Sequence, residues 1–206
     1  MAEIKTIKSK FLRNIFDQNT YIVESKKHVV LIDAGAEVED IKQAIENKKV
    51  LAVLLTHLHF DHIWNIEKYV AEWGCDVYVV GGEEVRFENV DLNASYIVRN
   101  SITKNVDKKF IKYYAEKLKI KEFEFDIVST PGHTSDGVCI LWNDNLFTGD
   151  TVFADGIGRT DLKDSNPFEM KSSLEKILKL DFKMAYPGHY EPADKDKITK
   201  TIHYYI

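Results

Sequence analysis

The chain has 206 residues, of which 44% are hydrophobic and 30% are charged, so a folded domain with its own core is expected and disorder is not. Its 28 Lys and Arg residues against 33 Asp and Glu residues leave a net charge of −5, which disfavours a protein that coats nucleic acid. The apolar runs are too short to cross a bilayer, and the first residues lack the uninterrupted apolar stretch of a signal peptide. We therefore expect one domain over residues 1–206, located in the cytoplasm.

The first half of the chain alternates between predicted strands and helices. We expect a strand where apolar and polar residues alternate or where a short run is rich in β-formers, and a helix where apolar residues recur every three to four positions. These patterns predict strands over 3–9, 20–25, 29–32, 50–55 and 76–80, and helices over 38–47 and 63–73. The polar, asparagine-rich stretch 83–121 is predicted to run over the surface, with some helix near 110–118.

The second half also contains predicted strands that are followed directly by polar residues. It predicts strands over 125–129, 137–142, 146–148 and 184–186, with a hairpin turn at 143–145, and helices over 166–180 and 194–205. The two β-rich halves indicate an α/β fold with mixed sheets. Cys75 and Cys139 lie far apart without a CxxC spacing, and we expect both to be buried, reduced thiols.

The densest group of metal-ligand side chains directly follows the strand predicted over 50–55, in the run THLHFDH at 56–62. His57, His59 and Asp61 alternate, so an extended loop would point all three the same way. His62 is expected to open the next helix. Imidazole nitrogens and carboxylate oxygens suit Zn²⁺, Fe or Mn²⁺. A solvated polar loop is the ordinary alternative, but this density of ligands at a strand-to-helix turn favours a metal site.

Three further candidate ligands share one local pattern, a glycine directly before the ligand at the end of a predicted strand. A lone histidine in a turn is more often structural, but together with the first group these residues exceed what one tetrahedral ion needs and fit two ions that share a carboxylate. The predicted ligands are His57, His59, Asp61, His62, His133, Asp150 and His189. The remaining histidines, His28 and His203, are predicted to have no metal role.

The order of these residues resembles the signature of the metallo-β-lactamase superfamily. The segment VVLIDAG over 29–35 resembles an earlier strand and loop of that superfamily, in which the aspartate, here Asp33, supports the metal loop. The resemblance covers about residues 20–190 and implies an αββα sandwich of two mixed β-sheets with flanking helices. It implies two divalent ions, zinc being expected and iron or manganese the alternatives. By resemblance, one ion is held by His57, His59 and His133, the other by Asp61, His62 and His189, with Asp150 bridging.

Within the superfamily, the segment GDTVFADGIGRTD over 149–161 resembles the glyoxalase II (hydroxyacylglutathione hydrolase)-like branch, where the Gly-Arg-Thr-Asp turn is characteristic. Arg159 and Asp161 are expected to brace this loop by a salt bridge or backbone hydrogen bonds. Asp150 stands where β-lactamases proper usually carry a cysteine, which argues against antibiotic hydrolysis. After His189 the 206-residue chain continues for only seventeen residues, fewer than the helical extension that supplies much of the glutathione pocket in glyoxalase II.

The implied activity is metal-dependent hydrolysis of a thioester of the hydroxyacylglutathione type. Two metal ions would lower the pKa of a bridging water from about 15.7 toward ~7, so that hydroxide attacks the thioester carbonyl. Asp61, which can accept a hydrogen bond from that water, and the bridging Asp150 are the predicted catalytic residues. The expected partner is a small-molecule substrate, without nucleic acid or membrane.

Three alternatives stay open at this point. A persulfide dioxygenase would use one iron held by His57, His133 and Asp150, although the Pro-Gly setting of His189 favours the hydrolase. A lactonase would need the same hydroxide, whereas a phosphodiesterase or nuclease is disfavoured by the acidic charge. A non-enzymatic metal-binding module is disfavoured because a two-metal site with room for water is reactive.

Overall fold

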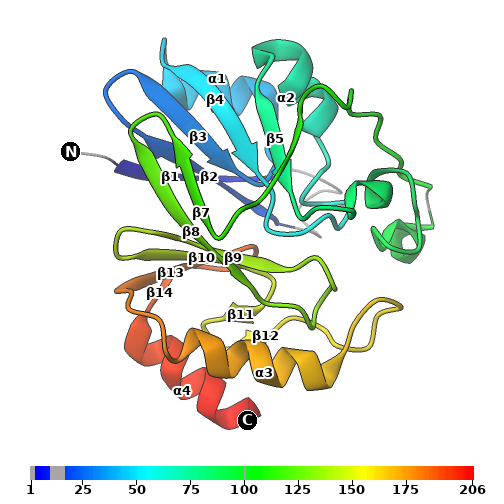
Figure 1. Cartoon of the computed structure of the whole chain (residues 1–206), viewed down its shortest axis with the longest axis vertical. Helices are drawn as coiled ribbons and strands as arrows, with labels where there is room; N and C mark the ends of the chain where they lie inside the picture. Colours follow the sequence, from blue (N-terminus) through cyan, green and yellow to red (C-terminus); the bar gives the residue numbers. More distant parts are fainter. Residues whose placement is uncertain (1–2, 10–16, 100) are drawn as a thin grey trace. The chain divides into compact units, whose positions relative to one another are not determined.

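The chain divides into two compact units, residues 1–113 and residues 114–206. The computed structural model describes residues 3–9, 17–99 and 101–206. Each unit contains its own six-stranded sheet (Figure 1), in agreement with the two β-rich halves expected from the sequence. That the units fold together as one domain over 1–206 stays a prediction.

The sheet of the first unit is mixed. Its strand order is β1-β2-β3-β4-β5-β6, with bounds Glu3–Lys8, Asn19–Glu24, His28–Ile32, Lys49–Leu54, Asp76–Val79 and Ile111–Tyr113. The first three strands pair antiparallel, and the pairs from β3 to β6 are parallel. The central strands β2, β3 and β4 are almost entirely buried, which explains why β3 and β4 are continuous apolar runs. The five strands predicted in this unit are confirmed.

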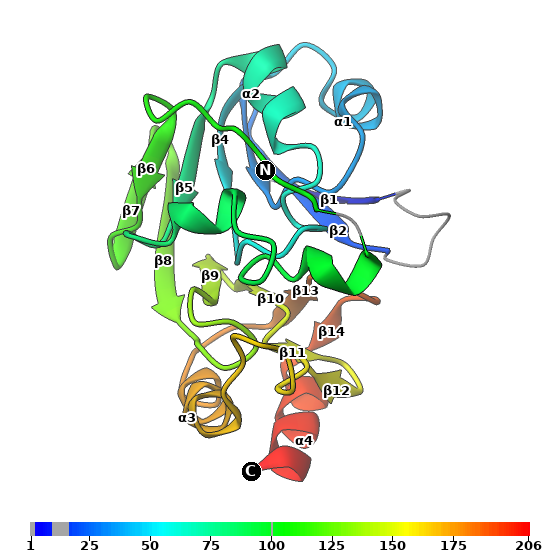
Figure 2. The same ribbon diagram turned by 90° about the vertical axis from the view of Figure 1, so that its right-hand side faces the viewer.

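Helices α1 (Val38–Ile45) and α2 (Ile66–Trp73) form the crossovers that parallel pairing of β3, β4 and β5 requires. On α1, the side chains of Val38, Ile41 and Ile45 recur at helical spacing and are buried in the same apolar cluster as the sheet residues. Figure 2 shows both helices beside this sheet. Replacing the fully buried Ile41 by alanine would cost about 2–5 kcal/mol of stability.

The helix predicted near 110–118 is wrong. Two strands lie there instead: β6, which pairs with β5, and β7 (Lys117–Ile120), which pairs with β8 (Phe123–Ser129). The residues of β7 alternate between polar and apolar, a period of two that outweighs the weak helical spacing. Between β5 and β6 the described residues form only two short 3-10 helices, η2 (Glu84–Phe87) and η3 (Ser95–Val98).

The sheet of the second unit is also mixed, with strand order β14-β13-β10-β9-β8-β7. Its remaining strands are β9 (Val138–Trp142), β10 (Asn145–Gly149), β13 (Met184–Pro187) and β14 (Ala193–Asp194). Only the β10–β13 pair is parallel. The predicted hairpin is confirmed as β9–β10, with Asn143 in the left-handed region that its tight turn needs. A small separate hairpin, β11 (Val152–Phe153) with β12 (Gly156–Ile157), was not predicted.

Two helices with well-formed N-terminal caps complete the second unit. The side chain of Asn166 accepts hydrogen bonds from two backbone amides at the start of α3 (Pro167–Ile177), and that of Asp194 accepts one from the Lys197 amide at the start of α4 (Lys195–Tyr205). Both helices pack apolar residues into one cluster with β9, β10 and β13. Both predicted helices are therefore confirmed, α3 ending slightly earlier than expected.

Cys75 and Cys139 are free and buried, as predicted. Burial raises the pKa of Cys75 to about 12 and that of Cys139 to about 11, because a thiolate loses its hydration inside the protein. Both thiols therefore stay protonated at neutral pH. Among the residues that the structure describes, no helix combines the length and apolar content needed to span a bilayer.

Candidate functional site

The first group of predicted ligands lies in the first unit, directly after the carboxyl end of β4. His57, His59, Asp61 and His62 are all buried. The ligand atoms of His57 lie within 4.8 Å of those of His59 and of His62, and those of Asp61 within 4.8 Å of those of His62. The ring centroids of His57 and His62 are only 4.0 Å apart. The structure thus brings these four side chains together, although His62 lies in a turn before α2 rather than at its first residue.

Asp33 follows the neighbouring parallel strand β3 and supports the loop at 56–62 that carries the first four ligands, here called the ligand loop. Its Oδ2 lies 2.8 Å from Nδ1 of His62, and its Oδ1 accepts the backbone N–H of Thr56 at 2.8 Å. The Thr56 hydroxyl donates to the same carboxylate, and Nδ1 of His57 lies 3.2 Å from that hydroxyl. Since carboxylates accept only, this network places protons on Nδ1 of both histidines and leaves the lone pairs on their Nε2 atoms. The supporting role expected of Asp33 is confirmed.

The backbone after β3 is tied to the backbone of the ligand loop. The Ala34 amide donates to the His62 carbonyl at 2.7 Å, and the Asn65 amide donates to the Ala34 carbonyl at 2.8 Å. The Asn65 side chain donates to the carbonyls of Gly35 and Ala36 at 3.0 and 2.9 Å. These bonds fix the turn between the ligands and α2. The sequence analysis missed Asn65; its only sequence signal is its place directly before a helix, where asparagine is a common cap.

The second group of ligands lies in the second unit, where β8, β10 and β13 end. Oδ2 of Asp150 lies 3.6 Å from Nε2 of His133 and 3.4 Å from Nε2 of His189. The Gly188 amide donates to the Gly149 carbonyl at 2.8 Å, which holds the residues before His189 and Asp150 side by side. One carboxylate oxygen of Asp150 therefore lies close to both imidazoles.

The turn at 158–161 positions His133. Nδ1 of His133 lies 2.9 Å from the carbonyl oxygen of Arg159, so this nitrogen carries the proton and Nε2 keeps its lone pair. Gly158 makes the close approach possible, because a Cβ there would lie 1.8 Å from the Asp150 carbonyl oxygen. The guanidinium of Arg159 donates two hydrogen bonds of 2.9 Å to Asp161, which confirms the predicted salt bridge and lowers the pKa of Asp161.

The donor set of both groups fits divalent metal ions. In His57, His62 and His133, a hydrogen bond occupies Nδ1 and leaves Nε2 as the potential ligand atom. This is the arrangement in which proteins orient metal-binding histidines, with a carboxylate, hydroxyl or carbonyl as the outer partner. His28 and His203 belong to none of the ligand groups found among the described residues.

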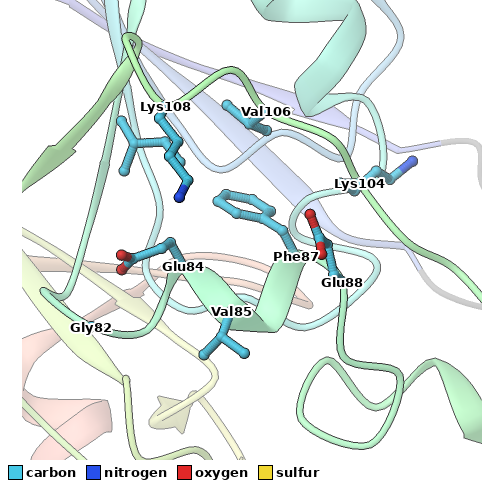
Figure 3. Close-up of a pocket in the computed structure, with 9 residues that line it drawn as sticks. Gly82, Glu84, Val85, Phe87, Glu88, Lys104, Val106 and Lys108 are labelled. Atoms are coloured by element: carbon cyan, nitrogen blue, oxygen red, sulfur yellow. The ribbon is translucent and has the colours of Figure 1, made fainter.

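A pocket of about 300 Å³ lies elsewhere in the first unit, between η2 and the chain leading to β6. Figure 3 shows the Phe87 ring at its centre, with Glu84 and Lys108 on one side and Glu88 and Lys104 on the other. None of the seven predicted ligands lines it. The pocket is therefore distinct from the ligand groups.

The model of the metallo-beta-lactamase superfamily matches residues 13–189, a stretch that contains all seven predicted ligands. The chain belongs to this superfamily. Among curated relatives, a probable metallo-hydrolase of Bacillus subtilis is 33% identical over 85% of this chain and 86% of its own length. A hydroxyacylglutathione hydrolase of Haemophilus influenzae is 31% identical over 80% of this chain and 81% of its own length.

Two solved structures, one of them a metallo-beta-lactamase, are similar along nearly the whole chain. BLEG-1, a B3 metallo-beta-lactamase, is 27% identical, with a TM-score of 0.89 over 98% of this chain and 99% of that one. TTHA1623, solved in a di-iron-bound form, is 26% identical, with a TM-score of 0.81 over 96% of this chain and 98% of that one. The predicted fold class is thereby confirmed, and the chain is a metallo-hydrolase of this superfamily.

Proposed function

We propose that this metallo-hydrolase cleaves thioesters of the hydroxyacylglutathione type. The observation that carries the proposal is the orientation of the ligand histidines: Asp33 and the Arg159 carbonyl hold Nδ1 of His62 and His133, which prepares their Nε2 atoms for metal. The hydroxyacylglutathione hydrolase of Haemophilus influenzae, matched over four fifths of its own length, supports the substrate class.

We further propose that the two ligand groups act as one binuclear site. His57, His59 and His133 would hold one divalent ion, Asp61, His62 and His189 the other, and Asp150 would serve both. When bound, such ions would lower the pKa of water and polarise the substrate carbonyl. Zinc is the expected metal, and the relative solved in a di-iron-bound form keeps iron as the alternative.

The residues of the chain have separate tasks in this proposal. The carboxylate of Asp61 accepts a hydrogen bond from the attacking water and so orients its lone pair toward the carbonyl carbon. Asp33 and Arg159 keep the imidazoles from rotating, so no reorganisation is needed when the substrate arrives. A thiolate is a good leaving group, which explains why the reaction would need no strong general acid beside the sulfur.

The test is hydrolysis of S-D-lactoylglutathione, followed by the loss of thioester absorbance, before and after removal of metal by a chelator and after return of Zn²⁺. We expect turnover that disappears with the metal and returns with it. Bound metal is measured in parallel, with two ions per chain expected. Asp150→Ala should lose both ions and turnover, whereas His203→Ala, which removes an exposed histidine on α4, should keep both.

Each contrary result has a distinct meaning. Absence of turnover of S-D-lactoylglutathione and of every other glutathione thioester tried on the metal-loaded protein would refute the thioester proposal. Oxygen uptake on glutathione persulfide with one iron per chain would replace it by the dioxygenase. Hydrolysis of a β-lactam would instead align the chain with BLEG-1. Normal turnover by Asp150→Ala with its metals still bound would refute the bridging role of Asp150.

A further inference from the structure

Tyr190 follows the candidate ligand His189 and has an uncommon backbone conformation. Its φ is 66°, in the left-handed region, where a bulky side chain is a genuine outlier. The conformation costs energy that glycine would not incur. Burial does not offset this cost, since Tyr190 is 68% exposed. Strained residues of this kind cluster at sites of function.

The Tyr190 ring is held among the rings of Phe153 and His189. Its centroid lies 5.4 Å from that of Phe153, with the planes nearly perpendicular, and 6.4 Å from that of His189. Phe153 in turn lies 6.3 Å from His189 in an edge-on arrangement. These are the geometries that aromatic pairs prefer. Because Phe153 is buried in the β11–β12 hairpin, it gives the exposed Tyr190 ring a fixed base.

The left-handed backbone therefore places a large apolar surface directly beside a candidate ligand. In the proposed reaction, the part of the substrate nearest to His189 would be the reacting carbonyl with the carbon groups attached to it. An exposed aromatic face next to these groups favours apolar and aromatic substituents on the substrate. Contact between the ring and such a substituent removes the apolar surface of both from water.

We propose that Tyr190 is a specificity-determining residue, which together with Phe153 forms an apolar wall that selects substrates carrying an apolar or aromatic acyl group. This inference rests on the proposed function, because it concerns the acyl part of the thioester. The aromatic ring of Tyr190 makes the selection, and its hydroxyl contributes little to it.

The test compares two thioesters, S-acetylglutathione and S-phenylacetylglutathione, on the zinc-loaded protein. Tyr190→Gly should lower kcat/KM for the phenylacetyl substrate about tenfold more than for the acetyl substrate, mostly through KM, in the range that pocket contacts give. Tyr190→Phe should keep most of the preference. Lys121→Gly, which relieves an equally uncommon φ of 52° in the exposed turn between β7 and β8, should leave both substrates unaffected.

A binding experiment separates this inference from the proposed function. S-benzylglutathione is a thioether that cannot be hydrolysed, and calorimetry on the zinc-loaded protein should give a Kd about tenfold weaker for Tyr190→Gly than for the wild type. The melting temperature of Tyr190→Gly should equal or exceed that of the wild type, since strain is relieved. An unchanged preference and unchanged Kd would overturn the inference, as would absence of thioether binding by the wild type. Failure of the wild type to hydrolyse any thioester, with binding intact, would refute only the proposed function.

Discussion

Oδ2 of Asp33 lies 2.8 Å from Nδ1 of His62, and both side chains are shielded from solvent. The two residues come from the ends of the parallel strands β3 and β4, which places the carboxylate under the ligand loop. A buried carboxylate that accepts from both an imidazole and the Thr56 backbone has little freedom to move.

Asp33→Asn should weaken metal binding by about 10–100-fold, because an amide places a donor where the His62 and Thr56 donors need acceptors. Zinc affinity is measured by competition with a coloured chelator. Asp91→Asn, a matched change at an exposed position of the same unit, should leave the affinity unchanged. Equal affinities of Asp33→Asn and the wild type would show that His62 needs no support.

Gly158→Ala should disrupt the second ligand group. Its new methyl group would lie 1.8 Å from the Asp150 carbonyl oxygen and 3.0 Å from Cβ of His133, so the turn must move away from both ligands. We expect a stability loss of about 1–3 kcal/mol, measured by urea unfolding, together with loss of metal. At Gly81 a Cβ would meet only ordinary contacts at 3.7 Å, and Gly81→Ala should change stability by less than about 0.5 kcal/mol. Similar stability of both variants would contradict the close approach at Gly158.

Arg159→Ala should bind metal as tightly as the wild type. His133 contacts the carbonyl of Arg159, which alanine retains, and the ion pair with Asp161 is exposed to solvent. Metal affinity and kcat/KM for the thioester are the two measurements. A large rise of KM with normal metal content would mean that the guanidinium contacts the substrate directly.

Glu24→Gln should lower stability at pH 7 by about 1 kcal/mol. Burial raises the pKa of Glu24, but ion pairs with Lys48 and Lys5 at 2.9 and 3.0 Å outweigh it and bring the pKa below its usual 4.5. A lowered pKa in the folded state stabilises the protein above pH 4.5, and this contribution disappears as the pH falls through the lowered pKa. Urea unfolding of both proteins from pH 7 to pH 3 should show converging stabilities. The ion-pair account would be refuted if the stability difference between Glu24→Gln and the wild type did not change with pH. It would also be refuted if Glu39→Gln, a change at an exposed position, gave the same stability difference.

Much of the fold was predictable because its strands and helices are locally consistent. β4 is a continuous apolar run, α1 repeats apolar residues at helical spacing, and α3 begins at Asn166-Pro167. The failures have the opposite cause. β6 and the two-residue strands β11, β12 and β14 carry too few residues for a period, and their partners along the sheet decide their conformation.

The ligands were predictable because their residue types bind metal and each follows a predicted strand. The groups that hydrogen-bond to the ligands and hold them in place were only partly predictable. Asp33 was found by resemblance, but the roles of the Arg159 carbonyl and Asn65 depend on which backbone atoms the fold brings together. The ring cluster around Tyr190 could not be foreseen, because nothing in the sequence indicates that a tyrosine adopts a left-handed conformation.

The two cysteines make the chain well suited to chemical labelling. Cys75 and Cys139 are buried, and their raised pKa values leave almost no thiolate at neutral pH, so alkylating dyes should not react with the folded protein. A cysteine introduced at an exposed position would then be the one that takes up a fluorophore. A label on α4, for example through Tyr204→Cys, could follow unfolding of the second unit without first replacing Cys75 or Cys139.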